Sequence, residues 1–308
     1  MSHPLLSIVI ANYNYGRFLG DAIQSVALQD MRDKVELIIC DAASTDNSVD
    51  VIKKYAKGLP SNVAYSDWIA TANHSSQESP LITWWCSEKD RGQSAAFNKG
   101  FSHARGRFLT WLNADDVIMP GTLKAFEKTV EQNPMCEWFV GGVMWLDKDM
   151  RIIKCGRGRP FSKLRADMGS LSVWGPSSFF AKSLFERAGG VDESFEYTMD
   201  TELWMRFYNR CSVRYLPFID YAWGLRIHED AKTSSQFFVC GESDKEINKR
   251  MVIRDEMNKI FARYKPPLSQ NFLRFVRSVN VWGSLMGRLD TIFNKGRRYE
   301  SYFGRGGK

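Results

Sequence analysis

Residues 108–116, FLTWLNADD, join an apolar strand-like run to two adjacent acids, Asp115 and Asp116. Ligands of an open α/β sheet bind beyond the carboxyl ends of its strands, so acids that directly follow a strand face a ligand. Carboxylate oxygens also bind the hard divalent cations that hold phosphates. The stretch therefore predicts a metal-assisted site for a phosphorylated substrate. The alternative is an acidic pair that caps the following helix.

The order of the remaining elements predicts an α/β fold. Strand-like runs lie at residues 6–10, 35–40, 82–86 and 108–112. Helical patterns lie between and after them at 18–28, 46–57, 93–104 and 121–132, and later near 183–188 and from Asp200. Such alternation is typical of a mostly parallel sheet flanked by helices. Residues 137–154 predict a hairpin, and residues 60–80 a long surface loop.

Cysteine usage and hydropathy predict a soluble cytoplasmic protein. The six cysteines are widely spaced and lack metal-ligand spacing, which favours reduced, buried thiols. No run approaches the ~20 apolar residues that span a bilayer. The first residues also lack the charged and apolar regions of a signal peptide.

The positive charge is concentrated at the C-terminal end. Residues 231–308 contain sixteen Lys and Arg against seven Asp and Glu, whereas the first 230 residues contain twenty-six against twenty-eight. We therefore predict a first unit over 1–230 and a basic helical extension over 231–308. Apolar residues interleaved with arginines at 272–289 indicate an amphipathic helix on an anionic membrane surface. The alternative is a helix packed on the first unit or on a partner subunit.

Four other residues are candidates for the same site. Asp41 ends the second strand, and Arg91 precedes a helix whose N–H groups could face a diphosphate. Asp200 begins a helix and is a candidate general base, and His228 is a candidate metal or phosphate ligand. Each has a simpler alternative: a capping turn for Asp41, a surface ion pair for Arg91, dipole stabilisation for Asp200, and an ordinary histidine.

Seven segments occur in a fixed order along the chain: SIVIANYN (7–14), DAASTD (41–46), SEKDRGQS (87–94), NKG (98–100), NADD (113–116), GGVDE (189–193) and DTELWMR (200–206). Taken together, they resemble glycosyltransferase family 2, an inverting group with the GT-A nucleotide-sugar fold. The resemblance spans about residues 5–230. It implies a Rossmann-like, mixed and mostly parallel sheet flanked by helices, with a C-terminal helical extension.

The resemblance also implies roles for the acidic residues. Asp115 and Asp116 match the family's D-x-D motif, with Asp116 as the ligand of Mg²⁺ or Mn²⁺ and Asp115 nearer the ribose. His228 lies where many GT-A enzymes contact the metal or the diphosphate. Asp200 lies at the position of the catalytic base.

A second set of positions matches the nucleotide-sugar site of the family. Asp41 and the backbone around Ala11 and Tyr13 correspond to the nucleoside pocket. Arg91 and Asn98 correspond to the donor-side segment before the D-x-D strand.

Two departures from the family pattern concern the nucleotide. Many members have proline at the position of Ala11 and a second acid at the position of Ala42, and that acid often contacts the base in uridine-dependent members. UDP remains the expected nucleotide. The Q-x-x-R-W motif of processive synthases is missing, so transfer of a single sugar is expected.

The implied function is inverting transfer from a UDP-sugar to a glycan or lipid-linked acceptor in cell-surface polysaccharide or glycoconjugate biosynthesis. The protein is expected in the cytoplasm or at the inner face of the membrane. One alternative is a noncatalytic nucleotide-sugar or glycan-binding protein on the same fold. A sugar-1-phosphate nucleotidyltransferase would require a glycine-rich loop after the first strand, but residues 12–17 contain a single glycine, Gly16. Nucleic-acid binding would not explain the acidic cluster and is not expected.

Overall fold

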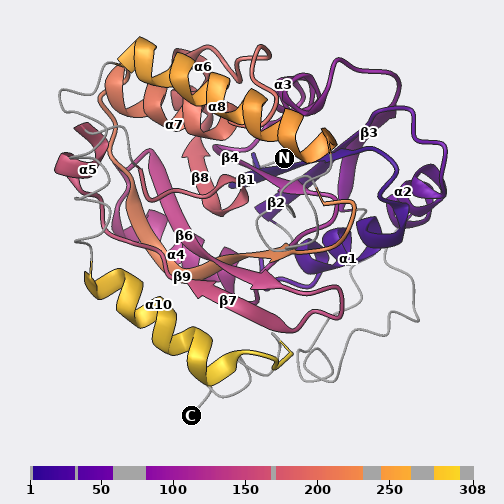
Figure 1. Cartoon of the computed structure of the whole chain (residues 1–308). Coiled ribbons are helices and arrows are strands. Elements are labelled where there is room, and N and C mark those ends of the chain that lie inside the picture. The colour runs from indigo at the N-terminus through magenta and orange to yellow at the C-terminus, as the bar shows by residue number, and fades with distance from the viewer. Residues whose placement is uncertain are drawn as a thin grey trace.

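The computed structural model describes residues 3–31, 34–57, 81–167, 171–231, 244–264 and 281–298. Figure 1 shows a twisted sheet with helices on both faces. The predicted loop at 60–80 lies outside the described residues, as does the first half, 272–280, of the predicted amphipathic segment at 272–289.

The first half of the chain forms the parallel part of the sheet, in the order β3-β2-β1-β4. The strands are β1 (Leu6–Asn12), β2 (Val35–Asp41), β3 (Ile82–Ser87) and β4 (Phe108–Asn113). Helices α1 (Gly16–Ala27), α2 (Ser48–Ala56) and α3 (Gln93–Ser102) connect them. Strands β1 and β2 are almost wholly buried, as expected where helices cover both faces of a parallel sheet.

The second half completes a mixed sheet of nine strands, which confirms the predicted fold class. The elements are β5 (Val117–Ile118), α4 (Thr122–Gln132), β6 (Trp138–Leu146), β7 (Ile152–Gly156), α5 (Lys163–Asp167), the 3-10 helix η3 (Gly175–Ser177), β8 (Ser178–Ala181), α6 (Lys182–Ala188), α7 (Met199–Asn209) and β9 (Leu216–Arg226). Strands β6 and β7 form the predicted hairpin. Strand β8 pairs antiparallel with β4 and β6, whereas β9 runs parallel to β6.

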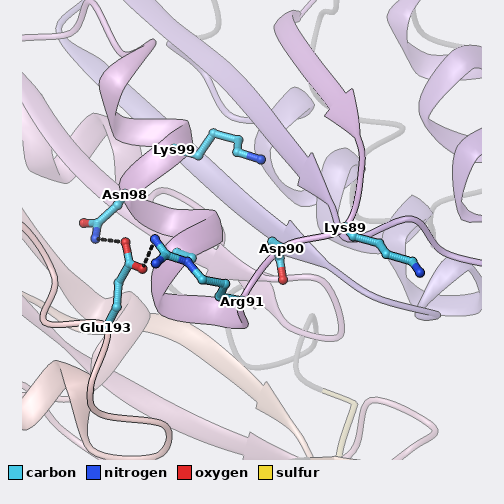
Figure 2. A pocket seen from close by; sticks show the side chains of 7 residues that line it. Lys89, Asp90, Arg91, Asn98, Lys99 and Glu193 are labelled. Atoms are coloured by element: carbon cyan, nitrogen blue, oxygen red, sulfur yellow. Dashed lines mark hydrogen bonds and ion pairs between the residues drawn. The ribbon is translucent and has the colours of Figure 1, made fainter.

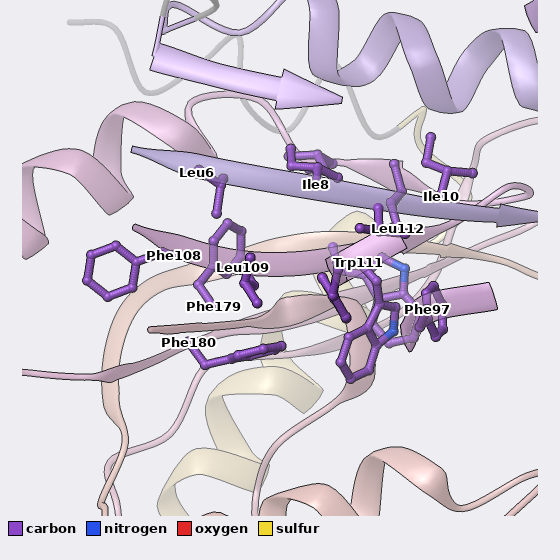
Figure 3. Packing of buried hydrophobic residues seen from close by; sticks show 14 of the residues in the cluster. Leu6, Ile8, Ile10, Phe97, Phe108, Leu109, Trp111, Leu112, Phe179 and Phe180 are labelled. Atoms are coloured by element: carbon purple, nitrogen blue, oxygen red, sulfur yellow. The ribbon is translucent and has the colours of Figure 1, made fainter. Parts of the chain in front are cut away.

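Aromatic side chains fill the core between β4 and the helices beside it (Figure 3). Trp111 of β4 stacks on Trp204 of α7, with ring centroids 5.3 Å apart and ring planes 2° from parallel. Burial of such rings dominates core energetics. The stack fixes α7 against the strand that leads into the acidic turn.

Two helices of the predicted extension pack on opposite sides of the first unit (Figure 1). Helix α8 (Asp244–Tyr264) lies on α7, and α10 (Val281–Asn294) lies on β7. Glu256 of α8 accepts the backbone N–H groups of Glu196, Tyr197 and Thr198 just before α7. No helix among the described residues is long and apolar enough to cross a membrane.

Candidate active site

The carboxyl ends of β1, β2 and β4 lie side by side at one edge of the sheet. The strand register aligns Asn12 with Asp41, and Ala11 with both Cys40 and Asn113. The parallel strands thus bring the polar residues that follow them to one place, as the sequence predicts.

Asp41 is buried and organises the turn after β2. Its carboxylate accepts hydrogen bonds from the Asn12 amide at 2.6 Å, the Ser44 hydroxyl at 2.5 Å and the Ser87 hydroxyl at 2.6 Å. The Ser44 backbone N–H donates a further bond at 3.0 Å. This network joins the ends of β1, β2 and β3 and fixes their positions beneath the site.

The adjacent loop presents one aromatic ring to solvent. The Tyr13 side chain is exposed, whereas Ala11 is only partly buried at the end of β1. Beside it, the Oδ1 atom of Asn12 is buried without a hydrogen-bond partner among the described residues. A buried acceptor without a partner is uncommon in proteins. This edge can therefore accept a ligand that stacks on an aromatic ring and donates a hydrogen bond.

The two acids of the turn after β4 point in different directions. Asp116 is fully buried, and its carboxylate accepts the Arg226 backbone N–H at 2.9 Å and the Asn113 amide at 2.7 Å. Burial, and then the charge of Asp115, raise the pKa of Asp116 well above its usual range. Asp115 instead has its Oδ2 atom 3.1 Å from Nε2 of His228. The two carboxylates therefore have separate environments.

His228 reaches Asp115 because β9 runs parallel to β6 and ends two residues earlier. Its ring packs on Phe18, with centroids 4.5 Å apart, and edge-on against Tyr15. The Tyr15 hydroxyl donates to the Asp230 carbonyl at 2.7 Å, so the residue that precedes α1 also holds the segment after His228. The buried Nδ1 atom of His228 has no partner among the described residues.

The Asp115–His228 pair has the donor atoms of a divalent-cation site. No cluster of three or more acidic, histidine or cysteine ligands occurs among the described residues. Mg²⁺ is commonly held by one or two carboxylates, with substrate phosphates and water as the other ligands. Carboxylate oxygens also suit Mn²⁺, and imidazole is a common ligand of other first-row metals. The residues present therefore fit a cation that is completed by a phosphorylated ligand.

Asp200 lies at the start of α7, next to Gly175 of the 3-10 helix η3. Its Oδ1 atom accepts the Thr201 N–H at 2.6 Å. A methyl group at Gly175 would lie 3.5 Å from Asp200 Oδ2 and 3.6 Å from the Trp111 indole nitrogen. Burial raises the pKa of the Asp200 carboxyl. Such a shift brings a carboxylate closer to the range useful for a general base.

Arg91 and Asn98 line an open depression of about 430 Å³ between α3 and the turn after α6 (Figure 2). Arg91 pairs with Glu193 at 2.7 Å, and its side chain is largely exposed. The Asn98 amide donates to the Val191 carbonyl and accepts the Val191 N–H, both at 2.9 Å. Asn98 thus holds this turn, whereas the Arg91 guanidinium can exchange its surface partner.

Gln93, at the first position of α3, contacts the end of β4 just before the acidic turn. Its amide donates to Asn113 Oδ1 at 3.0 Å, and Asn113 in turn donates to Asp116. The sequence pattern predicts no separate role for Gln93 or for the Asn113 side chain. The only indication in the sequence is a polar amide at the predicted start of a helix, for Gln93, and at the predicted end of a strand, for Asn113.

Comparison with known proteins identifies the family. The profile of "Glycosyl transferase family 2" matches residues 7–181, which is more than half of the chain. The chain belongs to glycosyl transferase family 2. This confirms the resemblance seen in the ordered sequence segments.

Relatives of this family 2 glycosyltransferase occur in bacteria and archaea. An uncharacterized glycosyltransferase of Nostoc sp. is 36% identical over 119 residues, which cover 39% of this chain and 30% of the relative. One from Methanocaldococcus jannaschii is 24% identical over 209 residues, covering 67% of this chain and 65% of the relative. The chain thus spans less than two thirds of either relative.

Solved structures share the fold. S. aureus TarS 1-349 in complex with UDP-GlcNAc has a TM-score of 0.54 and 16% identity, covering 83% of this chain and 72% of that chain. The mannosyltransferase PcManGT from Pyrobaculum calidifontis, in complex with GDP-Man and Mn²⁺, has a TM-score of 0.54 and 15% identity, covering 98% and 85%. The likeness shows a GT-A type of fold for this glycosyltransferase.

Proposed function

We propose that this glycosyltransferase transfers a single sugar, with inversion, from a UDP-sugar to a glycan or lipid-linked saccharide. The contact between Asp115 and His228 at the ligand-binding edge of the sheet carries the proposal. It joins two elements that are 113 residues apart in the chain into a site suited to a cation and a diphosphate. Two proteins of the same fold bind UDP-GlcNAc, and GDP-Man with Mn²⁺.

The geometry favours a different division of labour between the two acids from the one that the family motif suggested. Both oxygens of Asp116 accept hydrogen bonds from the protein, one from the Arg226 N–H at the end of β9 and one from the Asn113 amide at the end of β4. Asp115 is the carboxylate beside His228. We therefore assign the cation-facing role to Asp115 and His228, and assign to Asp116 the role of fixing the turn. A bound Mg²⁺ or Mn²⁺ would neutralise the departing nucleoside diphosphate.

Asp200 is proposed to remove the proton from the acceptor hydroxyl. Direct displacement at the anomeric carbon needs this base on the side opposite the leaving group, and one in-line step inverts the configuration. Burial beside Trp111 and Gly175 raises the pKa of Asp200, which strengthens it as a base. The stack of Trp111 on Trp204 holds α7, and with it Asp200, against β4.

The nucleoside is proposed to bind at the ends of β1 and β2. Tyr13 offers an exposed ring, Asn12 a buried acceptor, and Asp41 a carboxylate that fixes the strand ends beneath the site. Arg91 is proposed to exchange Glu193 for the donor diphosphate, whereas Asn98 supports this side through the Val191 turn. A lipid-linked acceptor would place the enzyme at the inner face of the membrane.

A donor screen tests this function. Release of nucleoside diphosphate from UDP-, GDP- and dTDP-sugars is measured with the wild-type chain and with Asp200→Asn. We expect donor binding by both proteins and turnover by the wild type only. Binding without turnover by the wild type, with a range of saccharide acceptors, would favour a noncatalytic protein on the same fold.

A further inference from the structure

The outer side of α10 combines exposed apolar and cationic side chains. Leu289, Ile292 and Phe293 are 36%, 71% and 69% exposed. We define the α10 surface as these residues together with three exposed cations of the same segment: Arg288, Lys295 and Arg297. Residues 281–298 contain a single acid, Asp290. The α10 surface therefore carries positive charge without acids of its own helix.

The inner side of α10 fixes this orientation. Asp290 accepts a hydrogen bond from the Arg157 guanidinium at 2.6 Å and another from the Tyr221 hydroxyl. The Thr291 hydroxyl accepts the Cys155 N–H of β7 at 2.9 Å. Successive residues of a helix are about 100° apart, so anchoring Asp290 and Thr291 turns Ile292 and Phe293 outward. The exposure of the two apolar side chains is thus imposed by the packing of the helix.

The α10 surface also lies near the edge of the sheet that carries the candidate active site. The Ile152 N–H donates to the Arg297 carbonyl at 2.7 Å. Ile152 pairs with Leu146 of β6, and Leu146 pairs with Arg226 of β9, two residues before His228. Three steps of about 5 Å place Arg297, three residues beyond the end of α10, about 15 Å from Arg226 along the sheet.

We propose that the α10 surface docks the protein on an anionic phospholipid bilayer. Single exposed apolar residues are normal on soluble proteins, but three beside three cations on an anchored helix match a surface with anionic headgroups and an apolar interior. A stable protein–protein interface buries about 800 Å² of each partner, which is more than the six side chains of the α10 surface offer. Docking here would bring the active-site edge of the sheet close to lipid-linked molecules.

Vesicle sedimentation of the full chain tests the docking. The probes are vesicles of phosphatidylcholine alone and of phosphatidylcholine with phosphatidylglycerol. We expect sedimentation with the anionic vesicles only, weakened by salt. The double variant I292S/F293S should lower the partition coefficient at least tenfold. The double variant R288E/K295E should lower it by about fivefold for each charge removed, or more because the charges are reversed.

Two matched controls locate the effect. Met135→Ser removes another exposed apolar side chain, 91% exposed, from a loop outside α10. K53E/K54E makes the same charge change on α2, at the far side of the molecule (Figure 1). Both should bind vesicles like the wild type, and circular dichroism checks the folding of each variant.

Equal binding to neutral and anionic vesicles, no binding, or unchanged binding of both α10 variants would each overturn the proposal. A dimer in solution that I292S/F293S abolishes would overturn it in favour of a second copy as the occupant. Vesicle binding requires no sugar transfer, so its failure leaves the proposed enzymatic function untouched. The converse also holds, because a donor screen in solution requires no vesicles.

Discussion

Glu256 of α8 should control both stability and the position of the proposed base. Its buried carboxylate accepts the N–H groups of Glu196, Tyr197 and Thr198 and the Thr198 hydroxyl. Thr198 lies two residues before Asp200. Glu256 therefore fixes the segment from which α7 begins, although it comes from a different part of the chain.

The cost of removing Glu256 follows from these bonds. Each hydrogen bond to a charged group contributes about 1.5–3 kcal/mol. Water can reach the donors of Glu196 and Tyr197 when the carboxylate is removed, so the two buried bonds to Thr198 set the loss. We expect Glu256→Ala to lower the free energy of unfolding by about 3–6 kcal/mol. Glu256→Gln retains one acceptor oxygen and should cost about 1–2 kcal/mol.

Urea denaturation followed by tryptophan fluorescence measures both variants. Asp255→Ala is the matched control, because Asp255 is an exposed neighbour on the same helix. It should change the free energy of unfolding by less than about 0.5 kcal/mol. The rate of sugar transfer by Glu256→Gln should fall while donor affinity stays constant. Equal stability of Glu256→Ala and Asp255→Ala would refute the reasoning.

Four further predictions concern the site and the α10 surface. Asp200→Asn should lower kcat by about 10²–10⁴-fold with little change in donor affinity; retained turnover would move the base elsewhere. Because burial raises the pKa of Asp200, transfer should be lost as pH falls through that raised pKa. Above the raised pKa the buried charge opposes folding, so Asp200→Asn should not lower the free energy of unfolding at neutral pH. A pH–rate profile and thermal unfolding check both signs, and an acid limb at the pKa of an exposed aspartate would contradict them. Tyr15→Phe removes the bond to the Asp230 carbonyl and should weaken metal-dependent donor binding several-fold, at a stability cost of about 1 kcal/mol; Asp230→Ala, which removes only an exposed ion pair with Arg17, is the control and should bind normally. I292S/F293S should abolish most binding to anionic vesicles while leaving donor turnover in solution unchanged.

The parallel half of the fold could be read from the sequence because its strands are short, apolar and separated by helical patterns. Strands β8 and β9 are not predicted from the sequence, and each differs from the strands of the parallel half. Strand β8 has only four residues and directly follows a 3-10 helix, and β9 contains Pro217 and Asp220. Strand β9 also pairs with β6, about eighty residues earlier, and such long-range pairing leaves no local pattern. These non-local strands carry His228 to the site.

The sequence predicts candidate residues for the site but not the contacts that they make. Side chains alternate along an extended chain, which predicts that Asp115 and Asp116 diverge. Which carboxylate faces His228 depends on the hydrogen bonds of Asn113 and Arg226. Asn98 fits the family motif, yet its amide is used to hold the Val191 turn. Local sequence identifies such side chains, whereas their partners come from distant segments.

Calorimetric titration of UDP with and without Mn²⁺ tests the assignment of the cation most directly. It compares the wild type with Asp115→Asn, His228→Ala and Asp116→Asn. We predict that Mn²⁺ strengthens UDP binding to the wild type and to Asp116→Asn, and that Asp115→Asn and His228→Ala abolish this enhancement. Undiminished enhancement in Asp115→Asn, with its loss in Asp116→Asn, would contradict the assignment and return the metal to Asp116.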